Sequence, residues 1–468
     1  MAQQVEDTDY LIVGSGAAGM AFADTLLAES DASIVMVDRH HGPGGHWNDA
    51  YSFVRLHQPS AYYGVNSKKL GQDARDETGL NVGMYERATG AEIVSYYEQL
   101  MQGFLATGRV QYFPMSDYIG HDPLKSHQFK SLMTGEVRQV NVGKKLVDTT
   151  YFNTAVPSTH PPKYAMASGV KCIPLNELPR VKQPPSGYVV VGSGKTGIDA
   201  CLWLLENGVA PDAITWIMPR DAWYMNRAYV QPGEDFFAQS FGSFTDQMDA
   251  VAQSQTVDEL LARLAANRQL LRLDDKVQPS MYHGAIMSDG EMNALKRIKN
   301  IVRLGRVMRI EKDQIVLEKG SIPSDADRLY VDCSASAVER RPAIPVFDGN
   351  RITAQMVRTF QPTFSAALIA YVEAHIDDEV EKNRLCHPIP MPGEPIHWLT
   401  MMAVNMVNQQ KWSKNKDLRN WMAQSRLDGF SGLARAVKPD DVEKMAILQR
   451  YAASAAPAAA NLQKLLSQ

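Results

Sequence analysis

The stretch that decides the fold runs Asp9-Tyr10-Leu11-Ile12-Val13-Gly14-Ser15-Gly16-Ala17-Ala18-Gly19. Its apolar residues predict a short buried strand, and its glycines predict a sharp turn into a helix over 20–27. Gly14 permits the turn, Gly16 lets the backbone approach a pyrophosphate, and Gly19 lets the helix pack close to the strand. Because the first amides of such a helix attract phosphate, the stretch predicts a dinucleotide-binding unit.

A second apolar run, over 33–37, supports this interpretation. It predicts a strand that ends in Asp38, nineteen residues after Gly19, where a carboxylate can accept hydrogen bonds from a ribose. The glycine motif alone is weak evidence, because similar turns occur in other α/β units.

Length and composition narrow the class of protein. A chain of 468 residues predicts two or three domains. Its net charge of -4 lacks the basic excess of a nucleic-acid binder, so no nucleic-acid partner is expected. The polar start over 1–8 resembles no export signal, and no stretch approaches the roughly 18 apolar residues of a membrane span. We therefore expect a cytoplasmic protein.

Cysteine and histidine spacing argue against a metal site. The four cysteines lie far apart, which leaves no Cys-x-x-Cys pair for metal or redox chemistry. The eleven histidines show no His-x-x-x-His spacing with an acidic partner. We expect no bound metal.

A glycine-rich loop follows Asp38 and reads Arg39-His40-His41-Gly42-Pro43-Gly44-Gly45-His46-Trp47-Asn48. Its backbone amides could wrap a nucleotide. Alternatively, it is a surface turn with Trp47 in the core. In order and spacing, the glycine motif, Asp38 and the Gly-Gly-His-Trp stretch resemble the FAD half of the class B flavin monooxygenase-like superfamily. The resemblance implies that FAD is bound by Gly14, Gly16, Gly19, Asp38, Arg39, Gly45, His46 and Trp47.

The resemblance also suggests candidate catalytic residues between 51 and 64. In the superfamily the matching stretch passes beside the isoalloxazine ring and offers an amide side chain there. Gln58 falls where the superfamily often has asparagine, and His57 is its neighbour. An equally favoured alternative is that both residues satisfy buried polar groups around the cofactor.

A second glycine turn makes the assignment far more specific. An apolar strand over 188–191 leads into Gly192-Ser193-Gly194-Lys195-Thr196-Gly197 and a helix over 198–205. A P-loop is excluded because Val189 stands where that motif requires glycine. The next strand ends at Arg220 instead of an acid, and Arg220, helped by Arg227, could pair with a 2′-phosphate. This turn, with Lys195 and Thr196, therefore predicts NADPH binding, unless Arg220 is an ordinary surface arginine.

These elements predict an α/β fold with two Rossmann-like dinucleotide-binding domains and a helical C-terminal region. We expect a discontinuous FAD domain over 1–157 and 329–468, with an NADPH domain over 158–328 inserted into it. A period-two pattern over 129–151 predicts an antiparallel meander, and Ser365 is the expected N-cap of a helix near the flavin. A helical insert after residue 236 could cap a substrate pocket or form a homodimer contact.

The resemblance implies a monooxygenase that uses FAD, NADPH and O2. NADPH would reduce the flavin, and a flavin C4a-(hydro)peroxide would oxygenate a small organic substrate. The superfamily signature Phe-x-Gly-x-x-x-His is missing, since the segment over 163–178 has Gly169 but no histidine. Two alternatives keep the fold: a single-component halogenase and an NADPH oxidase. A third, of another class, is a non-catalytic nucleotide-binding redox sensor.

Overall fold

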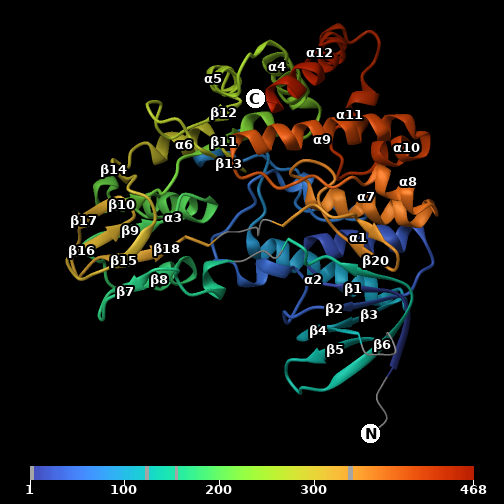
Figure 1. The fold of residues 1–468 in the computed structure, drawn as a ribbon, viewed down its shortest axis with the longest axis horizontal. Coiled ribbons are helices and arrows are strands. Elements are labelled where there is room, and N and C mark those ends of the chain that lie inside the picture. The colour runs from blue at the N-terminus through green and yellow to red at the C-terminus, as the bar shows by residue number, and fades with distance from the viewer. Residues whose placement is uncertain (1–4, 122–125, 153–155, 336–340, 468) are drawn as a thin grey trace.

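The computed structural model describes residues 5–121, 126–152, 156–335 and 341–467. Two sheets lie side by side with helices between and above them (Figure 1). The first domain is predicted to begin at residue 1 and to end at residue 468. Residues 1–4 and 468 lie outside the described residues. Within those residues, no helix is long and apolar enough to cross a membrane.

The first sheet is built around β1 (Val5–Val13), the strand that opens the first glycine turn. Its parallel neighbours are β2 (Ile34–Val37), with Tyr10 opposite Ile34, and β6 (Val137–Asp148), with Leu11 opposite Leu146. The predicted strand, turn and helix are confirmed, with α1 (Ala17–Glu29) following the turn. The strand order is β19-β20-β6-β1-β2-β3, with β3 (Val110–Phe113), β19 (Phe347–Asp348) and β20 (Arg351–Thr353).

The meander predicted over 129–151 is joined to this sheet. Strands β4 (Ser116–His121) and β5 (His127–Ser131) are antiparallel, and β5 pairs antiparallel with the first half of β6. The long β6 also runs parallel to β1. The hairpin is therefore an extension of the dinucleotide-binding sheet.

The second sheet has the order β14-β10-β9-β18-β8, all parallel. Its strands are β8 (Lys171–Pro174), β9 (Tyr188–Val191), β10 (Ile214–Ile217), β14 (Asn300–Val302) and β18 (Leu329–Asp332). The predicted return to the first domain at residue 329 is too early, because β18 pairs with β8 and β9. Its buried residues fit a central parallel strand, which is covered on both faces. The division into two domains otherwise stays a prediction.

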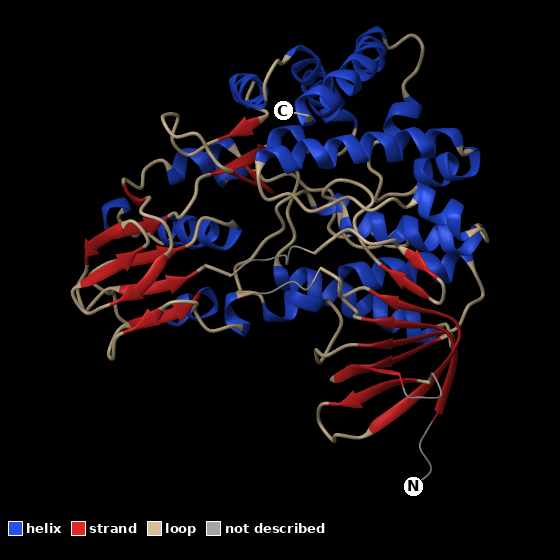
Figure 2. Ribbon diagram, in the orientation of Figure 1, coloured by secondary structure: helices blue, strands red, loops and turns tan. Residues whose placement is uncertain are grey.

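Two small sheets complete the strands, in the orders β12-β11-β13 and β17-β16-β15-β7. The first has β11 (Ala222–Asn226), β12 (Leu270–Leu271) and β13 (Met281–Met287). The second has β7 (Ala165–Met166), β15 (Val307–Ile310), β16 (Gln314–Leu317) and β17 (Gly320–Pro323). The sheet of β11, β12 and β13 lies between the second parallel sheet and the C-terminal helices (Figure 2).

The helical insert packs against C-terminal helices of the same chain. Helices α4 (Phe237–Gln253) and α5 (Val257–Ala266) share a buried apolar cluster with α9 and α12. The Asn461 amide of α12 donates to the carbonyls of Val251 and Ser254 at 2.7 Å each. The remaining helices are α2 (Gly90–Ala106), α3 (Lys195–Glu206), α6 (Asp289–Leu295), α7 (Pro362–His375), α8 (Glu379–Leu385), α9 (Pro395–Lys414), α10 (Lys416–Gln424), α11 (Ser431–Ala436) and α12 (Val442–Leu466).

Candidate functional site

The first glycine turn forms a cradle of backbone. Gly14 has φ +97°, and a Cβ at Gly19 would lie 2.0 Å from the Gly14 carbonyl oxygen, so strand and helix touch. Gly45 faces Gly16 from the glycine-rich loop, and a Cβ there would lie 2.9 Å from Gly16 Cα. Among the described residues, no side chain caps the N-terminus of α1. Its free amides therefore suit an anionic ligand such as a pyrophosphate.

Asp38 lies at the end of β2 and is buried beside this turn. Its carboxylate accepts hydrogen bonds from the backbone N and Oγ of Ser15 and from the backbone N and Nδ1 of His40. These bonds join the glycine turn to the following loop. The hydrogen bond to Asp38 and a second one to Asp49 raise the pKa of His40 to about 9. A ribose hydroxyl could reach Asp38 only by replacing one of these donors, so its role stays a prediction.

The other loop residues predicted to contact FAD have different surroundings. Arg39 is exposed, and its Nε lies 3.5 Å from Asp117 Oδ1. Burial lowers the pKa of His46 to about 4. Trp47 Nε1 donates to Tyr63 Oη at 2.7 Å, and the Trp47 ring packs against the cores of both dinucleotide-binding units. Trp47 is partly buried against these cores, and its contact with FAD stays a prediction.

The second glycine turn repeats the architecture of the first. Gly192 has φ +123°, and a Cβ at Gly197 would lie 2.1 Å from the Gly192 carbonyl oxygen. A Cβ at Gly194, by contrast, would meet no described atom within 4 Å. Gly194 is the N-cap of α3, whose first turn has no side-chain cap. The turn therefore presents open backbone amides.

Arg220 lies beside this turn, because Ser193 Oγ donates to the Arg220 carbonyl at 2.8 Å. The exposed Arg220 guanidinium forms no hydrogen bond or ion pair with any described residue, and the Thr196 hydroxyl forms no hydrogen bond with one. Arg220 lines a cavity of about 470 Å³ between the starts of α5 and α9. Both side chains are free to contact a nucleotide.

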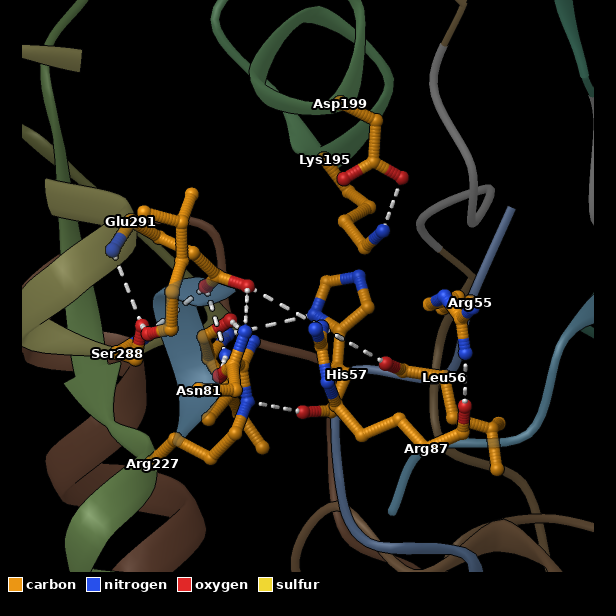
Figure 3. A network of polar contacts seen from close by, with 12 residues as sticks. Arg55, Leu56, His57, Asn81, Arg87, Lys195, Asp199, Arg227, Ser288 and Glu291 are labelled. Carbon is orange, nitrogen blue, oxygen red and sulfur yellow. Dashed lines mark hydrogen bonds and ion pairs between the residues drawn. The ribbon is translucent and has the colours of Figure 1, made fainter. Parts of the chain in front are cut away.

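The structure contradicts the predicted pairing of Arg227 with a 2′-phosphate. The Arg227 side chain is only 1% exposed, and all three of its nitrogens are hydrogen-bonded inside the protein. Nε donates to the His57 carbonyl at 2.8 Å, Nη2 to the Ile286 carbonyl at 2.9 Å, and Nη1 to Asn81 and to Glu291 at 2.7 Å (Figure 3). Arg227 therefore links the segments that carry His57, Asn81 and Glu291. It does not line the cavity that Arg220 lines.

Glu291 is the carboxylate at the centre of this network, and sequence reasoning missed it. Arg87 Nη1 lies 3.2 Å from Glu291 Oε1, whereas Arg227 pairs with Oε2. Burial raises the pKa of Glu291, but the positive charges of the two arginines outweigh burial, and the pKa falls to about 2. The Ser-x-x-Glu pattern ending in Glu291 could have shown its capping box on α6. No local signal predicts Arg87 or Asn81, because they come from distant segments.

His57 and Lys195 lie together beside the network (Figure 3). His57 Nδ1 accepts a hydrogen bond from the backbone N of Ile286 at 3.3 Å. Burial and the positive charges of Lys195, Arg227 and Arg87 hold the pKa of His57 well below its usual range. Lys195 pairs with Asp199, which also accepts a hydrogen bond from Tyr51 Oη. The Gln58 side chain forms no hydrogen bond with a described residue.

The start of α7 has polar atoms that need a partner. Buried oxygens of Thr359, Gln361 and Thr363 have no hydrogen bond with a described residue. Gln361 is the N-cap, so the predicted cap Ser365 lies one turn inside the helix, where its Oγ donates to the Gln361 carbonyl at 2.8 Å. Proline at the first helical position explains the earlier start.

Helices α1 and α7 run in the same direction. His375, at the end of α7, bonds Glu29, at the end of α1, at 2.8 Å, and the two helices pack along each other. They have nearly equal lengths, so their N-termini lie at the same end. The unpaired polar atoms at the start of α7 therefore lie at the same end of this helix pair as the first glycine turn.

Comparisons with known proteins agree with this architecture. Residues 12–66 match the model of an NAD(P)-binding Rossmann-like domain. The uncharacterized protein Rv2000 of Mycobacterium tuberculosis is 48% identical over 428 residues, covering 91% of this chain and 78% of the relative, and an uncharacterized protein of Mycobacterium bovis matches equally. The chain belongs to the family of these mycobacterial proteins.

A solved structure has a fold similar to that of this chain. The ε-caprolactone-bound structure of cyclohexanone monooxygenase in its Loose conformation matches with a TM-score of 0.50 and 14% identity, covering 81% of this chain and 92% of that one. The class B flavin monooxygenase-like fold expected from the sequence is thereby confirmed. At this identity the likeness concerns the fold alone.

Proposed function

We propose that the protein is an FAD- and NADPH-dependent oxidoreductase that uses O2 to oxygenate a small organic substrate. The observation that carries the proposal is the pair of glycine turns, each opening onto a helix N-terminus with no side-chain cap. Two such turns suit two dinucleotides, because uncapped amides need anionic or polar partners.

The residues around the first turn fit FAD. The Gly16 and Gly45 backbones touch each other, since a Cβ at Gly45 would lie 2.9 Å from Gly16 Cα, and neither residue has a side chain that would keep a pyrophosphate from the amides of the turn. Asp38 offers a carboxylate for the ribose, and the unpaired oxygens of Thr359 and Thr363 offer acceptors at the start of α7. The dipole of α7 would favour negative charge on a bound ring. Arg39, His46 and Trp47 stay predicted contacts of FAD.

The second turn fits NADPH. Gly192, Ser193, Gly194, Thr196 and Gly197 would hold the pyrophosphate through backbone amides and the threonine hydroxyl. The free guanidinium of Arg220 would pair with the 2′-phosphate, which NADH lacks. Bound FAD would take a hydride from NADPH and pass electrons to O2.

The protein's own part in the reaction lies between the two turns. Gln58 has an amide with no partner among the described residues, so it can donate to an oxygen atom in the reaction site. The His57 ring is held through its Nδ1, and the His57 backbone is held through its carbonyl. We infer that these two residues shape the oxygen site and limit the access of water to it.

Anaerobic mixing with NADPH, followed by O2, tests the proposal. Wild-type protein with bound FAD should bleach on NADPH addition, and reoxidation should pass through a transient absorbance before the oxidised spectrum returns. Direct reoxidation with one peroxide per NADPH would assign an NADPH oxidase instead. Bound flavin that NADPH does not bleach would favour a redox sensor, and product formation that requires halide would assign a halogenase.

A further inference from the structure

Two hydrogen-bond donors converge between the two dinucleotide-binding units without an acceptor. Because His57 Nδ1 accepts a hydrogen bond from the Ile286 amide, the proton of the neutral ring is on Nε2. That side of the ring faces the Lys195 ammonium group (Figure 3). Lys195 uses one of its protons on Asp199, and neither donor has another partner among the described residues. The space between them therefore suits an oxygen that accepts from both.

The surrounding charges favour an acceptor that is negative. Four cations and three carboxylates surround this space, which leaves one positive charge in excess. The cations are Arg55, Arg87, Lys195 and Arg227, and the carboxylates are Asp199, Glu206 and Glu291. Arg227 and Arg87 are both committed to Glu291. Arg55 and Lys195 both keep donors to spare, and Lys195 is the one that faces the free side of the His57 ring (Figure 3). An anionic oxygen there would gain a charge-assisted hydrogen bond in a poorly solvated site.

The direction of the Lys195 side chain separates this site from the NADPH phosphates. Asp199 lies one helical turn after Lys195, and their ion pair draws the ammonium group along α3 and away from the open amides at Gly194. Tyr51 holds Asp199 from the opposite unit. The Lys195 ammonium group is therefore turned toward the His57 ring (Figure 3).

We propose that His57 and Lys195 together bind a carboxylate oxygen of the substrate, so that the protein acts on small organic acids. This inference rests on the proposed function, because it assigns the substrate class of the same site. Gln58, next to His57 in the chain, would then lie beside the part of the acid that reacts. Neutral analogues of the acid would lose the ion pair with Lys195 and bind more weakly.

Isothermal titration calorimetry of the FAD-loaded protein tests the inference with benzoate and its neutral analogue benzamide. Benzoate should bind saturably and more tightly than benzamide. Lys195→Gln and His57→Asn should each weaken benzoate binding about tenfold, the loss of one charge-assisted hydrogen bond, and leave NADP+ binding within twofold. Asparagine keeps an acceptor for the Ile286 amide while removing the Nε2 donor.

Lys69→Gln is the matched control, because Lys69 forms the same i,i+4 ion pair with Asp73 on the surface. It should leave benzoate binding unchanged. Wild-type protein that does not bind benzoate would overturn the inference. So would a Lys195→Gln variant that loses NADP+ affinity and keeps benzoate affinity, because the ammonium group would then serve the cofactor. Neither result touches the proposed function, which fails separately if NADPH does not reduce the bound flavin.

Discussion

Replacing Glu291 with glutamine should destabilise the protein by about 3 kcal/mol at pH 7. Glu291 is 4% exposed and lies between the guanidinium groups of Arg227 and Arg87. Its pKa falls from 4.5 to about 2 in the folded protein. A difference of this size corresponds to about 3 kcal/mol, at the low end of the roughly 3–5 kcal/mol that breaking a buried ion pair costs.

The pH dependence gives this prediction its sign. Because folding lowers the pKa of Glu291, its contribution is complete above pH 4.5 and is lost as the pH falls through about 2. The difference in unfolding free energy between wild type and Glu291→Gln should therefore be constant from pH 7 to pH 5. It should fall to about half by pH 3. Urea unfolding followed by tryptophan fluorescence measures both quantities.

Glu381→Gln provides the matched control, because Glu381 pairs with Arg384 on the surface of α8. That change should cost less than about 1 kcal/mol, as exposed ion pairs do. Equal losses in the two variants would refute the argument that burial makes the Glu291 pair important. A Glu291→Gln deficit that stays the same down to pH 3 would show that charge is not its source.

Three further predictions concern the glycine turns and their neighbours. Gly197→Ala should abolish soluble expression, since its Cβ would lie 2.1 Å from a backbone oxygen, whereas Gly194→Ala should fold with an unchanged melting temperature and lose NADPH binding. Arg220→Ala should raise KM for NADPH about tenfold and leave KM for NADH unchanged in steady-state assays. His40 stabilises the protein fully below pH 6.5, and this contribution should disappear as the pH rises through about 9, so the melting temperatures of wild type and His40→Gln should converge there.

The sequence predicted the parts of the fold that depend on local patterns. The strand before Gly14 and the strand before Gly192 are apolar runs that end in glycine, and both lie where expected. The close approach of Gly19 to the strand follows from the same pattern. These features need only neighbouring residues, so a single sequence is enough to find them.

The errors concern residues whose roles depend on distant partners. Arg227 follows a strand near Arg220, which favoured a phosphate contact, but Glu291 and Asn81 from other segments surround it. The strand over 329–332 belongs to the second sheet because it fits between β8 and β9. No spacing rule shows which of two parallel sheets takes a buried strand. Long-range packing decided both cases.

Long-range contacts of this kind also link the two glycine turns to each other. Tyr51 and His57 lie in the segment that follows the first glycine turn, and they contact Asp199 and Arg227 of the second unit. One contact is to the helix that the second turn opens, and the other is to the buried ion network around Glu291. In the proposed reaction a hydride passes between two rings, which requires the protein to set the position of one turn relative to the other. We infer that the segment carrying His57 sets this position. The contacts that join the two units and the candidate catalytic residue Gln58 therefore lie next to each other in the chain.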